Sequence, residues 1–163
     1  MTAALVATPV LRAPEPPMPK TLLPLSTPDD TEAAYYDALL HADLEQLMAC
    51  WSDEDDIVCV LPGTHRLIGH AQIRAAFEAL MTNGSIRVVV ENLHKTETAS
   101  STIHSALVHV SMGAADRPED LWLFVTSVYV KTAHGWRLVA HHASPGMQES
   151  VTGSWVAADT TLH

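Results

Sequence analysis

Residues 120–144 have the sequence DLWLFVTSVYVKTAHGWRLVAHHAS, two runs of alternating residues that meet at Gly135. The alternation predicts strands over about 120–131 and 135–143, and a glycine between two such runs is typical of a turn. The first run is apolar on both parities, with Trp122 and Phe124 on one face and Leu121 and Leu123 on the other. We therefore predict two adjacent strands in a sheet that is covered on both faces.

The segments before this pair change from helical to alternating periodicity. Apolar residues at helical spacing predict helices from about Asp29 to Leu40, from Asp43 to Trp51 and from Gly69 to Met81, with Phe77 facing inward. A short strand is expected at about 56–61, and longer strands at about 86–97 and 102–112. Three helices followed by a run of strands predict an α+β fold, with the helices against one face of a curved antiparallel sheet.

The two ends of the chain differ in composition from its middle. Seven of the ten prolines lie within residues 1–28, where no hydrophobic period is present. We expect an extended proline-rich arm over 1–28, a domain over 29–147 and a loosely held tail over 148–163.

Composition excludes several classes of partner. The 163 residues are 47% hydrophobic, and 19 acidic against 9 basic side chains give a formal net charge of −10. This charge argues against nucleic acid and anionic membrane as main partners. No apolar run approaches the roughly 20 residues that cross a bilayer, and the first residues lack a basic start, so a cytoplasmic location is expected.

The second apolar face of the 120–131 strand needs a cover. If helices occupy one face, another subunit is the simplest cover for the other. We predict a homodimer that forms through the sheet.

Several short motifs resemble those of one known superfamily. They are Tyr35-Tyr36-Asp37-Ala38-Leu39-Leu40-His41-Ala42-Asp43-Leu44, the segment Trp51 to Val58, Pro62-Gly63, Leu67-Ile68-Gly69 with Ile73, Gly135-Trp136-Arg137-Leu138-Val139 and His142-Ala143-Ser144. In this order and spacing they resemble the SnoaL-like, ketosteroid-isomerase-related branch of the nuclear transport factor 2-like superfamily. The resemblance covers about two thirds of the chain. It implies a cone-shaped curved sheet wrapped on about three N-terminal helices, with a pocket between them.

The resemblance implies one hydrogen-bond donor in this chain, but the catalytic base of the isomerases is missing from the sequence. In the isomerases of this superfamily a tyrosine of the first helix donates a hydrogen bond to an enolate oxygen, and Tyr35 stands at the matching position. The same isomerases carry a carboxylate just before a proline, but here Val60 and Leu61 precede Pro62. We therefore do not expect a steroid isomerase. Tyr35 can also be a core tyrosine with a satisfied hydroxyl.

Other candidate residues are a set of aromatic and acidic side chains. Trp51, Phe77 and Trp122 are candidate walls of an apolar pocket, with core packing as the alternative for Trp51. Asp56 is the member of an acidic cluster, residues 53–56, that we expect to point inward as an acid or base. Glu91 is a reserve candidate for the missing base, since alternation does not decide which way it faces.

Histidine is abundant, with ten residues, and parity separates the ones in predicted strands. His104 shares a face with Ala106 and Val108, which makes it a candidate ligand-binding residue. His142 shares a face with Trp136 and Leu138, and its place in the His-x-Ser ending makes it the preferred catalytic histidine. A buried structural histidine is the alternative for His142.

Metal and nucleophile motifs are not present in the sequence. No HExxH or His-x-His pattern occurs, and the acidic cluster lacks the glycine and terminal glutamate of an EF-hand loop. We expect no cofactor and no metal. Cys50 and Cys59 have no basic neighbour in the sequence and are expected to be inert buried thiols.

Two functions are compatible with these observations. The first is a pocket that binds a small apolar or aromatic molecule, and that acts as a cofactor-free isomerase, cyclase or dehydratase through Tyr35 with His142 or Asp56. The second is a non-catalytic dimerisation or ligand-binding module. The fold alone does not decide between them.

Overall fold

The computed structural model describes residues 25–113 and 119–147. The helices are α1 (Pro28–His41), α2 (Leu44–Ala49) and α3 (Gly69–Met81). The strands are β1 (Val58–Val60), β2 (Leu67–Ile68), β3 (Ile86–Glu97), β4 (Ser101–Met112), β5 (Glu119–Thr132) and β6 (Gly135–Pro145). These elements agree closely with the helices and strands that periodicity predicts.

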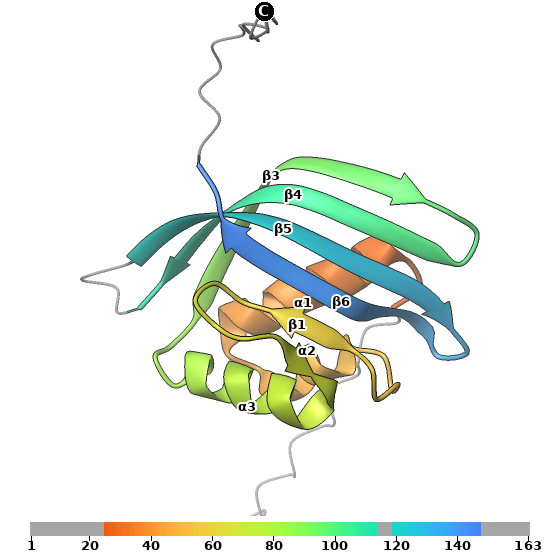
Figure 1. Ribbon diagram of the computed structural model, residues 1–163, viewed down its shortest axis with the longest axis horizontal. Coiled ribbons are helices and arrows are strands. Elements are labelled where there is room, and N and C mark those ends of the chain that lie inside the picture. Colours follow the sequence, from red (N-terminus) through yellow and green to blue (C-terminus); the bar gives the residue numbers. More distant parts are fainter. Residues whose placement is uncertain (1–24, 114–118, 148–163) are drawn as a thin grey trace, which may run out of the picture.

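One six-stranded sheet, in the order β2-β1-β6-β5-β4-β3, curves over the helices (Figure 1). The four long strands pair antiparallel in sequence order, as predicted. The short strand β1 is different, because it pairs parallel to β6 and antiparallel to β2. The sheet is thus mixed, and the predicted α+β architecture with helices against one face of a curved sheet is confirmed.

Helix α1 begins earlier than its acidic first turn suggests. The N-cap is Thr27, whose hydroxyl accepts from the backbone N–H of Asp30, while the Asp30 carboxylate accepts from the Thr27 N–H. This reciprocal capping box places Pro28 at the first helical position, where no N–H is needed. At the other end Ala42 adopts a left-handed conformation with φ 51°, and the N-cap of the next helix is Asp43.

A β-bulge changes which side chains of β6 face the helices. Val128 of β5 pairs with Ala140 and the next residue, Tyr129, pairs with Leu138, so Val139 is an extra residue in β6. The inward parity therefore shifts along the strand: Leu138 before the bulge and His141 after it are both buried. Strict alternation over the whole strand is not maintained.

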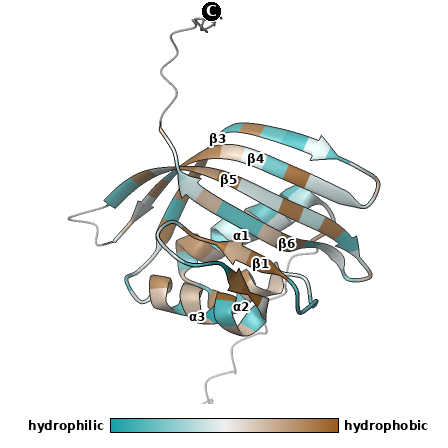
Figure 2. Ribbon diagram, viewed as in Figure 1, coloured by the Kyte–Doolittle hydropathy of each residue, from teal (hydrophilic) through white to brown (hydrophobic). Residues whose placement is uncertain are grey.

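The concave inner face of the sheet and the helices enclose the apolar core. Hydrophobic and hydrophilic residues alternate along the long strands (Figure 2). Several apolar side chains of the convex outer face remain exposed, among them Phe124 at 46%, Val89 at 46% and Ile103 at 40%. The expectation that β5 is apolar on both faces is met.

Parts of two predictions lie outside the described residues. Residues 1–24 of the predicted arm and residues 148–163, the predicted tail, are not described. Residue Leu25 is described, and its carbonyl accepts a hydrogen bond from the N–H of Trp136 at the start of β6. Among the described helices, none combines the length and the apolar composition that a membrane span requires.

Candidate functional site

A cavity of about 480 Å³ lies between the helices and the inner face of the sheet. Its walls come from α1, α3, the segment after β1 and strands β3 to β6. Most of the lining is apolar, including Leu39, Phe77, Leu80, Val108, Met112 and Leu123. Such a concave, mainly apolar space with few polar groups is typical of a small-molecule site.

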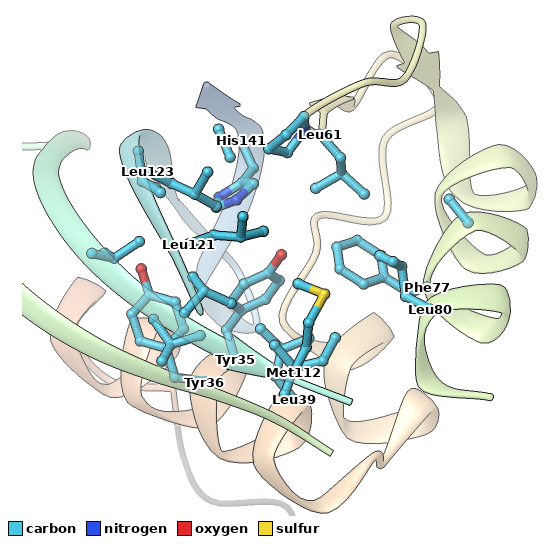
Figure 3. A pocket seen from close by; sticks show the side chains of 18 of the residues that line it. Tyr35, Tyr36, Leu39, Leu61, Phe77, Leu80, Met112, Leu121, Leu123 and His141 are labelled. Atoms are coloured by element: carbon cyan, nitrogen blue, oxygen red, sulfur yellow. The ribbon is translucent and has the colours of Figure 1, made fainter. Parts of the chain in front are cut away.

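Four polar side chains line this apolar cavity: Thr64 in the segment after β1, and Tyr35, Tyr36 and His141, which are labelled in Figure 3. Tyr35 and Tyr36 come from α1, and His141 comes from β6. The rings of Tyr35 and His141 are neighbours, with centroids 5.3 Å apart. A ligand in the cavity would therefore meet a phenol and an imidazole side by side.

His141 is buried and held by one side chain behind it. Its Nδ1 lies 2.9 Å from the hydroxyl oxygen of Ser127, which is also buried. Burial, with a smaller contribution from the neighbouring His142, lowers the pKa of His141 to about 4. The imidazole is therefore neutral at pH 7, and Nε2 is the ring nitrogen that Ser127 leaves free.

Tyr35 presents a protonated phenol. Burial is the main cause that raises its pKa well above the usual value of 10.0. Its ring packs edge-on against Trp51 and Phe77. Its ring also contacts the rings of Tyr36 and His141, and its hydroxyl makes no hydrogen bond to another described residue. A buried donor of this kind suits a ligand oxygen.

Of the residues predicted from the sequence, Tyr35 and Phe77 line the cavity. The two tryptophans do not line it. Trp51 is fully buried in the core behind Tyr35, with ring centroids 6.5 Å apart. Trp122 lies on the outer face of β5, where it stacks on His109 at 4.8 Å. The interpretation of Trp122 as a pocket wall is wrong because even-numbered residues of β5 face away from the helices.

Three predicted acid or base residues point to solvent. His142 is exposed, because the bulge at Val139 turns His141 rather than His142 toward the helices. Asp56 is exposed in the turn before β1. Glu91 is exposed on β3, where it pairs with Leu107 and alternates with inward-facing Val90. The structure thus corrects the expected placement of all three.

His104 is on the inner face, as its parity predicts, but it is not among the residues that line the cavity. It lies against the first turn of α1, near Glu32, with its ring 4.9 Å from that of Tyr129. The interpretation of His104 as a residue of the same pocket as Tyr35 is therefore not supported by its position.

His141 is the site residue that sequence reasoning missed. The adjacent pair His141-His142 offered one inward residue, and simple alternation selected the wrong one. The signal that decides is the register of β5 against β6, where Ser127 pairs with His141. A bulge position leaves little trace in a single sequence.

No carboxylate is among the described residues that line the cavity. Leu61, directly before Pro62, lines it instead. The place at which the resemblance implies a carboxylate base thus carries an apolar side chain, and His141 is the one imidazole available there. The two cysteines are buried, and burial raises each thiol pKa to about 12, as expected for inert thiols.

Comparisons with known proteins agree on the fold. A family model described as a SnoaL-like domain matches residues 29–148. A structure from Thiobacillus denitrificans, provisionally described as a calcium/calmodulin-dependent protein kinase type II association domain, is 31% identical with a TM-score of 0.66, over 76% of this chain and 98% of that one.

Two more distant structures carry descriptions of enzymes. One from Streptomyces avermitilis, provisionally described as a dehydratase from the NTF2-like family, is 24% identical with a TM-score of 0.66, over 72% of this chain and 91% of that one. One from Novosphingobium aromaticivorans, provisionally described as an aromatic ring hydroxylase, is 21% identical with a TM-score of 0.65, over 73% and 86% of the two chains. No curated protein matches the chain.

Proposed function

The chain belongs to the SnoaL-like domain family, and on that premise we propose that its cavity binds a small apolar molecule with one carbonyl or hydroxyl oxygen and catalyses proton transfer on it. The observation that carries this proposal is the unpartnered Tyr35 hydroxyl beside the neutral imidazole of His141 in an apolar cavity. The reaction class is an isomerisation, cyclisation or dehydration that needs no cofactor.

Tyr35 has the properties of an electrophilic donor. Because its pKa is raised, it stays protonated and can donate to a ligand oxygen throughout the neutral range. The apolar lining strengthens this hydrogen bond, since little water competes for the oxygen. Negative charge that develops on that oxygen during enolisation would be stabilised most.

His141 is the proposed base. When Nδ1–H donates to Ser127, the lone pair of Nε2 is available to accept a proton from the carbon next to the bound oxygen. The same Nε2–H can then return the proton to another carbon of the substrate, or to a leaving hydroxyl group. The low pKa makes this imidazole a weak base, so the hydrogen bond from Tyr35 has to supply part of the driving force.

A ketone probe tests both roles without knowledge of the natural substrate. We expect the protein to bind 2-acetonaphthone, and Tyr35→Phe to weaken this binding by roughly 2- to 10-fold, which is the usual value of one hydrogen bond. Binding of 2-ethylnaphthalene, which lacks the oxygen, should not change. In D2O, the wild type should accelerate deuterium exchange of the acetyl methyl protons, measured by NMR, and His141→Gln should slow this exchange at least about tenfold.

His142→Gln is the matched control, because it removes the adjacent exposed imidazole. Equal exchange rates in the His141 and His142 variants would contradict the base assignment. Equal loss of both probes in Tyr35→Phe would show that the tyrosine contributes packing rather than a hydrogen bond.

A second candidate is a non-catalytic dimerisation module, favoured by the apolar outer face of the sheet. Phe124, Val89 and Ile103 are exposed there, with Trp122 beside them. The description of the Thiobacillus denitrificans relative as an association domain supports assembly as a role for this fold. We propose that this face forms a homodimer. The two candidates are compatible, because the cavity opens on the opposite, inner face.

A further inference from the structure

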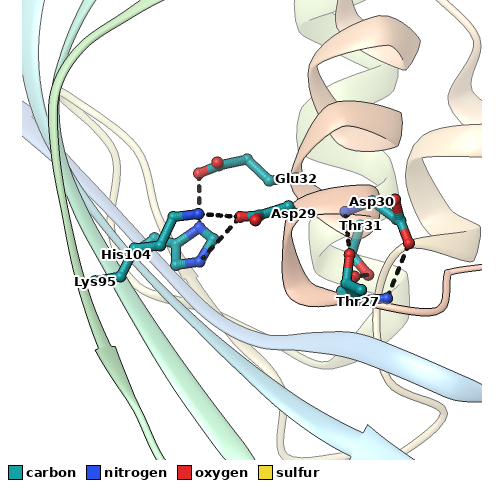
Figure 4. A network of polar contacts seen from close by, with 7 residues as sticks. All are labelled: Thr27, Asp29, Asp30, Thr31, Glu32, Lys95 and His104. Atoms are coloured by element: carbon teal, nitrogen blue, oxygen red, sulfur yellow. Dashed lines mark hydrogen bonds and ion pairs between the residues drawn. The ribbon is translucent and has the colours of Figure 1, made fainter.

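A second polar cluster lies away from the cavity, where the start of α1 meets β4 (Figure 4). Asp29 and Glu32 come from the first turns of α1, and His104 comes from the inner face of β4. One ligand atom from each of the three lies within 4.8 Å of the others. The Glu32 carboxylate is 3.2 Å from Nδ1 of His104, and the Asp29 carboxylate is 3.7 Å from Nε2.

His104 has no hydrogen-bond partner within the described residues, although its side chain is only 1% exposed. Both carboxylates approach the ring at ion-pair distance but without hydrogen-bond geometry. The ring of Tyr129 packs against it at 4.9 Å and helps to exclude water. Buried polar nitrogens are normally satisfied, so an imidazole left in this state requires an explanation.

A metal ion would explain the geometry. In a tetrahedral zinc site with bond lengths of about 2.0–2.1 Å, neighbouring ligand atoms are about 3.3 Å apart. The 3.2 Å between His104 and Glu32 is close to this separation. One imidazole nitrogen and two carboxylate oxygens suit borderline divalent ions such as Zn²⁺. We propose that Asp29, Glu32 and His104 bind a divalent transition-metal ion of the zinc type.

Lys95 is the group with which this ion competes. Its ammonium lies 2.5 Å from the Asp29 oxygen that faces His104. Without a metal, Lys95 supplies one positive charge opposite the two carboxylates. A divalent ion that displaces Lys95 matches the charge of both carboxylates. Lys95 and Asp29 are both partly exposed, so the side chain can leave and the ion can enter from solvent.

Zinc titration of the full chain, free of any affinity tag and pretreated with EDTA, tests the site. We expect calorimetry to detect one saturable Zn²⁺ site, and Co²⁺ to give the visible absorption of a low-coordinate nitrogen–oxygen complex. His104→Gln should weaken the affinity at least about tenfold, since even loss of a group behind a ligand costs roughly 10- to 100-fold. Lys95→Gln should instead tighten binding, because it removes the competing cation.

His109→Gln is the matched control, because His109 also lies near a carboxylate, Asp120 at 3.6 Å, on the outer face. It should leave the affinity unchanged. Asp29→Asn is the second ligand variant for use if His104→Gln does not fold, since Asp30 rather than Asp29 completes the capping box with Thr27. Failure of Zn²⁺ to bind the wild type, equal affinity in a ligand variant and the wild type, or weaker binding in Lys95→Gln would each overturn the proposal.

Discussion

At the residue scale, the environment decides what each polar group of the cavity can do. Tyr35 and His141 are buried neighbours, and their shifted pKa values keep both neutral at pH 7. Burial raises the pKa of the phenol and lowers that of the imidazole for the same reason, because each charged form is poorly solvated. The pair is therefore suited to exchange protons with a neutral ligand rather than to hold a charged one.

The lowered pKa of His141 predicts how stability depends on pH. The pKa is about 4 in the folded protein against 6.5 for the ordinary value, so the unfolded chain binds more protons between these pH values. The contribution of His141 to the free energy of unfolding is fully present above pH 6.5 and is lost as the pH falls toward 4. The loss from this group should reach about 3 kcal/mol, and His141→Gln should remove that part of the pH dependence.

Urea unfolding at several pH values between 7.5 and 4.5 measures this effect. The comparison is with His142→Gln, whose imidazole is exposed and whose slope should resemble that of the wild type. An unchanged slope in His141→Gln would show that His141 is not the group responsible.

At the element scale, the two ends of helix α1 differ in how well they are capped. The N-terminus has a complete capping box, whereas the C-terminus is closed by Ala42 in the left-handed region with φ 51°. A side chain in this region costs roughly 1–2 kcal/mol, and glycine avoids that cost. A weak point of the helix is thus a single exposed residue.

We expect Ala42→Gly to stabilise the protein by about 1 kcal/mol. Its matched control is Ala33→Gly, since Ala33 is also exposed but lies inside α1 with helical geometry. There the same substitution should destabilise by about 1 kcal/mol. Urea unfolding with an unchanged m-value would measure both, and a loss of stability in Ala42→Gly would contradict the strain argument.

At the scale of the whole molecule, the curved sheet has two apolar faces and the chain has an excess of negative charge. The inner face is covered by helices, while Phe124 and its neighbours remain exposed on the outer face. Two copies that associate through this face bring together two chains of formal charge −10. Hydrophobic burial favours the proposed dimer and charge repulsion opposes it.

We expect Phe124→Asp to convert the dimer to a monomer, as measured by light scattering after size exclusion. Ile68→Asp is the control, because Ile68 is equally exposed, at 45%, but lies on the short strand β2 at the far edge of the sheet. The dimer of the wild type should tighten as NaCl rises from about 0.02 to 0.5 M, since salt screens the repulsion. A monomeric wild type at micromolar concentration would contradict the dimer.

The sequence alone determined the elements and their order. Helical spacing in residues 29–81 and alternation after residue 86 predicted nearly all of the helices and strands, because these periods arise locally from backbone geometry. The same local patterns, together with the motifs around Tyr35 and Gly135, predicted the fold and one of the cavity's polar residues. The secondary structure of a segment is determined largely by the residues within it and beside it.

The tertiary structure alone decided which polar side chains meet. The bulge at Val139 is a shift in the register between β5 and β6, and it places His141 rather than His142 at the cavity. The cluster of Asp29, Glu32 and His104 likewise forms because α1 packs beneath β4, and no short motif contains all three. Strand register and helix packing join residues that are distant in the chain, so one inserted residue or one helix crossing decides the site while leaving the local pattern unchanged.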